Sequence, residues 1–229
     1  MLSQSLAPAP VRPHWAQPAP GDAEDSPLLA RHPELVVTEF TYGRNECIFG
    51  EGEIAEYVYQ VMCGSVRSYR LLDDGRRQIG AFHLVRDVFG LECGSSHRLT
   101  AEAICETKVR IVKRRSLEAA AKSDVVVACR LWTITANALR HAEDHMLSLG
   151  RKTAAQRVAT FLLEMDRRIS VSGQVTLPML RCDIADYLGL TLETVSRAVS
   201  QFHDEGVLTL SGPRHIRLRD RARLAAMAA

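Results

Sequence analysis

Apolar residues recur at helical spacing between Arg181 and Gly206, with one break near the middle of the segment. Gly189 stands at the break, where a turn residue must reach a positive φ. The pattern predicts two short helices joined at Gly189. The apolar positions on the two sides of the break are Ile184, Ala185, Leu188 and Leu190, then Val195, Ala198, Val199 and Phe202.

The second predicted helix has a clear start and a polar outer face. The hydroxyl of Thr191 can cap its N-terminus, and Glu193 suits the positive end of the helix dipole. Arginine can donate to guanine, glutamate can accept from the cytosine amino group, and serine can do either, so this face suits the DNA major groove. A solvated face on an ordinary helical hairpin is the competing interpretation. The outer face consists of Glu193, Thr194, Ser196, Arg197 and Gln201.

The residues that follow Gly206 favour the DNA-reading interpretation. Residues 207–210 and 215–219 have the pattern of two short strands, with Ser211, Gly212 and Pro213 forming the turn between them. Two helices followed by a two-stranded wing predict a winged helix-turn-helix domain.

The chain before this domain has a different sequence pattern. Short β-prone runs punctuated by glycine extend from Leu35 to about Lys113 and predict a sandwich or barrel. Residues 1–30 are rich in alanine and proline, which predicts a disordered extension. We therefore expect an α+β chain with four parts: the extension at 1–30, a β domain at 31–115, a helix at 116–150 and a DNA-binding domain at 151–229.

The longest helical pattern runs from Arg115 to Gly150 and carries two apolar stripes. One stripe can cover the β domain, while the other can pack against the same helix of a second subunit as a parallel coiled coil. A monomer with a thick helical layer is the alternative. The first stripe is Val127, Leu131, Ile134 and Ala138, and the second, proposed for dimerisation, is Trp132, Leu139, Ala142, Met146 and Leu149.

From about Glu34 to Arg219 the chain resembles the CRP/FNR superfamily of bacterial transcription regulators, most closely its FNR/FixK branch. The motif that carries the resemblance is Glu193-Thr194-Val195-Ser196-Arg197. In that branch the residues matching Glu193, Ser196 and Arg197 read the half-site TTGAT of the palindrome TTGAT-N4-ATCAA, whereas the cyclic-AMP-receptor branch has glycine in place of Ser196.

The resemblance implies an N-terminal jelly roll like that of cyclic-nucleotide-binding domains, a long dimerisation helix and a C-terminal winged helix-turn-helix. It implies a homodimer on double-stranded DNA, since a twofold protein reads a twofold site. It also implies an activator that recruits RNA polymerase, in the service of microaerobic respiration, denitrification or nitrogen fixation. The residues expected along the DNA backbone are Arg181, Cys182, Thr191 and Thr194.

Two features of the chain depart from regulators that depend on a cofactor. Members that bind cyclic AMP hold its phosphate with a glutamate and an Arg-Ser pair. Here Glu92 is present, but Leu99 stands where the arginine is expected, and Arg98 would point to the other face of a strand. No cysteine precedes Cys47 and there is no C-x-x-C pair, so neither an iron–sulfur cluster nor a structural zinc is expected. We expect no cofactor.

Cys182 differs from the other five cysteines. The others, at 47, 63, 93, 105 and 129, lie in apolar runs and are expected to be inert core residues. Cys182 follows Arg181 at the start of a helix, where backbone N–H groups and the guanidinium favour thiolate. Two interpretations stand: a small polar residue near phosphate, or a redox-sensitive thiol whose oxidation places a negative charge there.

Composition adds less. The net charge of +2 is small, but residues 151–229 hold 12 basic and 8 acidic residues, so the basic surplus lies in the predicted DNA-binding domain. No apolar run reaches the roughly 20 residues that span a bilayer, and we expect a cytoplasmic protein without membrane contact. A cupin-like metal enzyme would need a His-x-His pair, which the chain lacks, so no catalytic site is expected.

The alternative function is a ligand-gated regulator, with haem on His83 or another small molecule in the β roll.

Overall fold

The computed structural model describes residues 35–229, so the extension expected at residues 1–30 lies outside the described residues. Within this part of the chain, the strands that precede the first helix are β1 (Val37–Tyr42), β2 (Cys47–Phe49), β3 (Tyr57–Cys63), β4 (Val66–Leu71), β5 (Arg77–His83), β6 (Val88–Phe89), β7 (Thr100–Ala103) and β8 (Thr107–Lys113).

These strands form two four-stranded sheets, in the orders β1-β8-β3-β6 and β2-β7-β4-β5, with antiparallel neighbours throughout. Gly64 turns β3 into β4 at a φ of +85°, and a Cβ there would lie 2.4 Å from Thr107 Oγ1, so only glycine fits. The predicted jelly roll is confirmed. Its interior is packed with Phe49, Tyr59, Val61, Val66, Phe89, Ala101 and Val109.

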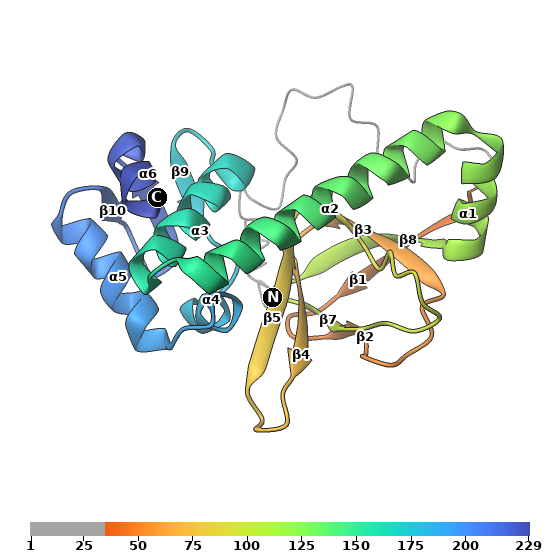
Figure 1. Cartoon of the computed structure of the whole chain (residues 1–229). Helices are drawn as coiled ribbons and strands as arrows, with labels where there is room; N and C mark the ends of the chain where they lie inside the picture. Colours follow the sequence, from red (N-terminus) through yellow and green to blue (C-terminus); the bar gives the residue numbers. More distant parts are fainter. Residues whose placement is uncertain (1–34) are drawn as a thin grey trace, which may run out of the picture.

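Two helices, α1 (Arg114–Ser123) and α2 (Val125–Arg151), follow the β domain. The expectation of one helical run from Arg115 to Gly150 is wrong at Asp124, which adopts an extended conformation and caps α2 by accepting a hydrogen bond from Val126 N at 2.7 Å. Helix α2 runs from α1, beside the β domain, to the C-terminal helices (Figure 1). It therefore links the two ends of the molecule.

The first apolar stripe of α2 covers the β domain as expected. Val127 is buried, and Leu131 and Ile134 pack against the same cluster, which includes Val58 and Val112. Ala138, the last member of the stripe, is exposed.

The C-terminal part begins three residues after α2. The wing sheet has the order β10-β11-β9, so the two strands predicted for the wing are joined by a third from before the helices. Helix α6 was not expected; it buries Leu224 against the core of this domain. The elements are α3 (Ala154–Ile169), β9 (Gln174–Thr176), α4 (Arg181–Leu188), α5 (Leu192–Asp204), β10 (Leu208–Leu210), β11 (His215–Leu218) and α6 (Arg221–Ala228).

Candidate nucleic-acid interface

Helices α4 and α5 form the predicted helix-turn-helix. Gly189 ends α4 in the left-handed conformation, with φ 62° and ψ 42°, and its N–H donates to Ala185 O. Val195, Ala198 and Phe202 of α5 are buried against α3 and α4 in the core of the domain. The local sequence signals for two helices about Gly189 are confirmed.

The first turn of α5 is capped by a hydroxyl. Thr191 Oγ1 accepts from Thr194 N at 3.2 Å and lies 3.0 Å from Thr194 Oγ1. The pKa of the Glu193 carboxyl is lowered by hydrogen bonds from its own backbone N–H and from Thr191, and then by the nearby Arg197. Glu193 is therefore an anion at neutral pH, able to accept a hydrogen bond from a base.

The outer face of α5 is available to a partner. Glu193 and Arg197 are exposed, and Ser196 is partly exposed between them. Arg197 Nη2 lies 3.5 Å from Thr194 Oγ1, a long contact that a base edge could replace. Gln201 is engaged further along, where its Nε2 donates to Glu205 Oε1 at 2.9 Å. The structure thus presents the three residues predicted to read bases side by side on one helix turn.

Arg181 and Cys182 occupy the first turn of α4. Cys182 is an exposed free thiol and Arg181 is partly exposed. Both stand beside the free backbone N–H groups that begin a helix, an arrangement suited to phosphate.

The basic residues of the wing and tail divide into two groups. Arg217 and Arg219 are exposed on the wing. Arg221 instead donates to Asp166 at 2.7 and 2.9 Å, and Arg223 pairs with Glu205 at 3.1 Å. Arg221 and Arg223 are therefore already bound by carboxylates of the protein, whereas Arg217 and Arg219 can meet DNA phosphate.

Arg157 is a residue that the sequence analysis missed. Its guanidinium donates to Leu149 O at 2.6 Å and to Lys152 O at 3.0 Å, at the end of α2, and to Leu188 O at 3.0 Å, at the end of α4. One side chain thus satisfies terminal carbonyls of two helices. No local pattern marks it, because its partners come together only in the folded chain.

The β roll has aromatic packing where a ligand phosphate would be expected. The His97 ring stacks on Phe49 with centroids 3.6 Å apart, and Glu92 Oε2 lies 3.1 Å from His97 Nδ1. Leu99 approaches Gly80 closely enough that a Cβ on Gly80 would lie 3.3 Å from it. Arg98 is exposed on the surface. Arg98 precedes β7, which begins at Thr100, so the expected alternation of strand faces does not decide its direction, although the residue is exposed.

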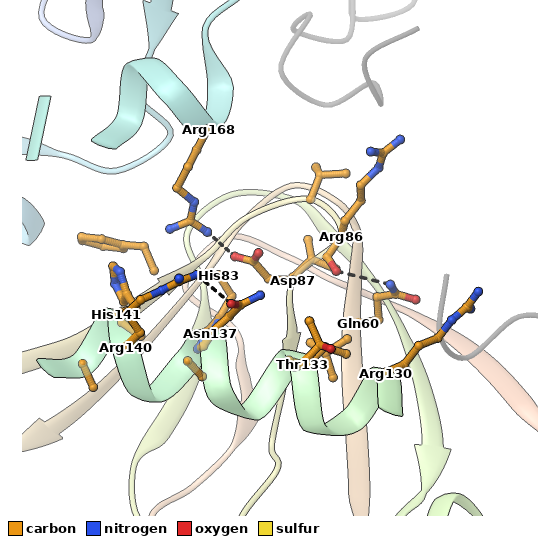
Figure 2. A pocket seen from close by; sticks show the side chains of 18 of the residues that line it. Gln60, His83, Arg86, Asp87, Arg130, Thr133, Asn137, Arg140, His141 and Arg168 are labelled. Carbon is orange, nitrogen blue, oxygen red and sulfur yellow. Dashed lines mark hydrogen bonds and ion pairs between the residues drawn. The ribbon is translucent and has the colours of Figure 1, made fainter. Parts of the chain in front are cut away.

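A groove of about 1280 Å³ is lined by the β domain, one side of α2 and residues of α3. Figure 2 shows Thr133, Asn137 and Arg140 of α2 facing the loop that carries Arg86 and Asp87, with Arg168 of α3 reaching Asp87. The Gln60 side chain lines the groove, and its Oε1 is buried without a hydrogen-bond partner. The groove therefore has a largely apolar lining that includes one buried acceptor without a hydrogen-bond partner.

His83 also lines the groove but is already engaged. Its Nε2 lies 2.8 Å from Ser68 Oγ, and its ring stacks on Phe89 with centroids 4.7 Å apart. Burial lowers the pKa of His83 to about 4, so it is neutral at pH 7. With Nε2 engaged in this way, His83 is poorly placed to ligate a haem iron.

The second stripe of α2 is an exposed apolar seam. Val125, Trp132, Leu139 and Met146 stand seven residues apart and are 75%, 77%, 60% and 64% exposed. Ala142, three residues after Leu139, is exposed, and Leu149 is partly buried. A heptad of large apolar residues facing solvent is typical of a helix whose coiled-coil partner is a separate chain. We call Val125, Trp132, Leu139 and Met146 the seam.

The expectation of five buried cysteines is wrong. Cys47, Cys93 and Cys129 are exposed, and Cys63 and Cys105 are partly buried. Apolar neighbours in sequence do not fix the face to which a side chain points, because strand residues alternate between faces and a helix turns through several.

Comparison with known proteins decides the family. Residues 39–124 match the cyclic nucleotide-binding domain family, and residues 156–227 match the Crp-like helix-turn-helix domain family. The nitrogen fixation regulation protein FixK of Azorhizobium caulinodans is 44% identical over 92% of this chain and 87% of its own length. The chain belongs to the CRP/FNR family. The FixK of Rhizobium meliloti is 41% identical over 80% of this chain and 82% of its own length.

The solved structure of FixK2 from Bradyrhizobium japonicum is 68% identical to this CRP/FNR chain, with a TM-score of 0.83 over 85% of this chain and 98% of that one. The chain is a DNA-binding transcription regulator and not an enzyme. No helix among residues 35–229 has the length and apolar character needed to cross a membrane.

Proposed function

We propose that this regulator activates transcription by binding the palindrome TTGAT-N4-ATCAA as a homodimer, without a cyclic nucleotide or an iron–sulfur cluster, and that oxidation of Cys182 inactivates it. The observation that carries the proposal is that Glu193, Ser196 and Arg197 share the outer face of α5, with Glu193 and Arg197 exposed and Ser196 partly exposed. In the proposed complex Glu193 accepts from cytosine and orients Arg197, Arg197 donates to guanine, and Ser196 contacts thymine or its flank. RNA polymerase is the partner that bound dimers recruit.

The homodimer part of the proposal is supported by the seam on α2. Its residues are exposed in a single chain, and burying four large side chains on each helix against a second copy would remove several hundred Å² of apolar surface from water. The symmetry of the palindrome requires two reading helices related by a twofold axis.

Selection of bound fragments from random DNA by the full chain tests the proposal. Under reducing conditions we expect enrichment of TTGAT and ATCAA separated by four bases, with the same sequences whether or not cyclic AMP is present. Enrichment of an unrelated sequence, or of none, would contradict the proposal.

A second candidate function is a ligand-gated regulator, and the buried, unpartnered Gln60 Oε1 in the groove favours it. A ligand with an N–H or O–H donor would satisfy this acceptor. This candidate predicts that the purified protein carries a bound small molecule or shows a haem absorbance band. Alternatively, the selection experiment would give DNA binding only after cyclic AMP is added.

Substitution of Cys182 tests the redox part of the proposal. We expect hydrogen peroxide to abolish DNA binding by the native protein and to spare Cys182→Ala, measured by fluorescence anisotropy on the palindrome. A sulfinate or sulfonate is a permanent anion, and two unit charges about 6 Å apart repel by roughly 3 kcal/mol at an effective dielectric near 20. The same repulsion acts at both half-sites.

The other exposed cysteines supply the control for this test. Cys47→Ala and Cys93→Ala remove exposed thiols from the β domain, and both variants should lose DNA binding with peroxide as the native protein does. Equal loss in the native protein and in Cys182→Ala would rule out the role of Cys182.

A further inference from the structure

Helix α4 has two chemically distinct faces. Arg181 and Cys182 point outward, whereas Asp183 is 1% exposed and Tyr187 is buried. The buried face lies against β5 of the β domain, so the first helix of the helix-turn-helix contacts the other domain directly. This contact is unexpected for a helix whose outer side is proposed to follow the DNA backbone.

Ion pairs between the domains dominate the contact. Asp183 Oδ1 accepts from Arg67 Nη1 at 3.0 Å and from Arg77 Nη2 at 2.6 Å. Its other oxygen accepts from Leu180 N at 3.0 Å. Asp186, one helix turn later, accepts from Arg77 Nε at 3.0 Å and Nη2 at 2.8 Å. Two carboxylates of α4 therefore bind two guanidinium groups of β4 and β5.

The β domain holds those guanidinium groups in place. Arg67 faces Glu102 across the β4–β7 register and forms an ion pair with it. Tyr69 OH donates to Glu102 Oε2 at 3.0 Å, and the Arg77 guanidinium carbon lies 5.2 Å from the centre of the Tyr69 ring. Contacts within the β domain restrain both arginines, so little side-chain entropy is lost when they bind α4.

Polar and apolar contacts complete the junction. Gln78 Nε2 donates to Asp186 O at 2.8 Å and to Tyr187 O at 3.3 Å, carbonyls at the end of α4 that lack helical partners. The Tyr187 ring packs 5.1 Å from Phe82 of β5. Ile79 and Phe82 belong to the same buried cluster as the core of the DNA-binding domain. Separating the domains would expose this cluster and leave Asp183 without its two arginines.

We propose that Arg67, Arg77, Gln78, Asp183 and Asp186 form an interdomain clamp that sets the position of the reading helix, and thereby the spacing of half-sites that the dimer accepts. Without the clamp, the DNA-binding domain joins α2 through Lys152 and Thr153 and keeps the contacts of Arg157, the Arg168–Asp87 ion pair and the packing of Tyr187. With the clamp, each reading helix is fixed to its β domain and so to the dimer axis. The proposal rests on the palindrome-binding dimer proposed above.

The clamp is expected to affect the half-site spacing that the dimer prefers, and not its recognition of bases. A dimer gains affinity from its second half-site only if the second reading helix reaches it without strain. A dimer with the clamp loses affinity on DNA with the wrong half-site spacing, because its second reading helix, α5, reaches the half-site only with strain. A dimer without the clamp can shift α5 to fit another spacing. The clamp residues are thus positioning residues that act through α4, and none of them is expected to touch a base.

Charge reversal across the partly buried pair Arg77–Asp186 tests the clamp. The variants are R77E, D186R and the double variant, each made in the full chain. Dissociation constants are measured on duplexes with TTGAT and ATCAA separated by three, four, five or six base pairs, and on a duplex with one half-site scrambled. Thermal melting and the oligomeric state are recorded in parallel.

We expect the native protein to prefer the four-base spacing by about tenfold or more. R77E and D186R should reduce that preference to about twofold, while affinity for the single half-site stays within about twofold of the native value. The double variant should recover only part of the preference, because it re-forms the ion pair with position 186 but leaves a carboxylate beside the buried Asp183. Q78A, which removes only the contacts to the end of α4, should give a partial loss and serves if the charge variants do not fold.

The clamp is overturned if the single-charge variants, or Q78A when these do not fold, keep the native spacing preference. It is also overturned if their half-site affinity falls as far as their palindrome affinity, since that result signals general damage to the DNA-binding domain. A native protein that binds no palindrome would overturn the proposed function itself, whereas native binding with unchanged variants overturns the clamp alone.

Discussion

Replacing Arg197 with alanine is expected to lower the affinity for the palindrome by about 2 to 6 kcal/mol, because each of the two half-sites loses about 1 to 3 kcal/mol. The preference for guanine at the contacted base should disappear with it. Arg197 is exposed and makes one long contact, to the Thr194 hydroxyl at 3.5 Å, so the substitution removes no packing. The measurement is a set of dissociation constants for the palindrome and for duplexes changed at that base pair.

Arg181→Ala is the matched control for Arg197→Ala. It removes the same charge from a position expected along the DNA backbone, so it should weaken binding to all sequences alike and reduce the salt dependence. The melting temperature should stay close to the native value in both variants. If Arg197→Ala kept the native preference for TTGAT, the assignment of base reading to α5 would be refuted.

Replacing Leu139 with glutamate is expected to convert the protein to a monomer and to lower its affinity for the palindrome by about 10²- to 10⁴-fold, the range by which a linked second site raises avidity. In a parallel dimer the two glutamates would face each other in the seam, where each carboxylate is desolvated beside a like charge. Leu139 is 60% exposed in the single chain, so the protomer should fold normally.

Leu147 supplies the control for the seam. It is also a leucine of α2, 58% exposed, but it lies one position after Met146 and outside the heptad. Leu147→Glu should remain a dimer and bind the palindrome as the native protein does. Analytical ultracentrifugation measures the mass of both variants, and a dimeric Leu139→Glu would contradict the role of the seam.

The helix-turn-helix of α4 and α5 could be predicted from sequence because the residues that determine it lie close together in the chain. Gly189 needs a positive φ, Thr191 caps the helix that follows it, and the apolar residues fall at helical spacing within 26 residues. Each signal acts on neighbours in the chain, where side-chain propensity and capping decide the conformation. The structure agrees with them residue by residue.

The clamp could not be predicted because its partners are distant in sequence. Asp183 is separated from Arg67 by 116 residues and from Arg77 by 106. In the sequence Asp183 resembles any acidic residue in the first turn of a helix, where the dipole favours it. Only the folded chain shows that it is buried with two arginines.

The misplaced cysteines and the interrupted helix have related causes. Cys129 lies in an apolar stretch, but α2 turns it to solvent. Asp124 fits a helical pattern by spacing, yet its side chain competes for the backbone N–H of Val126 and ends one helix as it starts the next. In both cases the hydrophobic pattern predicts a helix, whereas the folded structure decides which residues face solvent and where the helix ends.

In the proposed homodimer, the length of α2 makes the position of each DNA-binding domain sensitive to small tilts of the helix. At about 1.5 Å per residue, its 27 residues span about 40 Å from the β domain to the DNA-binding domain. A tilt of about 5° at one end moves the other by roughly 3.5 Å, close to the rise of one base pair along a DNA strand. In that homodimer, the crossing angle of the two α2 helices would have to be held to within a few degrees for both α5 helices to stay in register with the base pairs of the double helix.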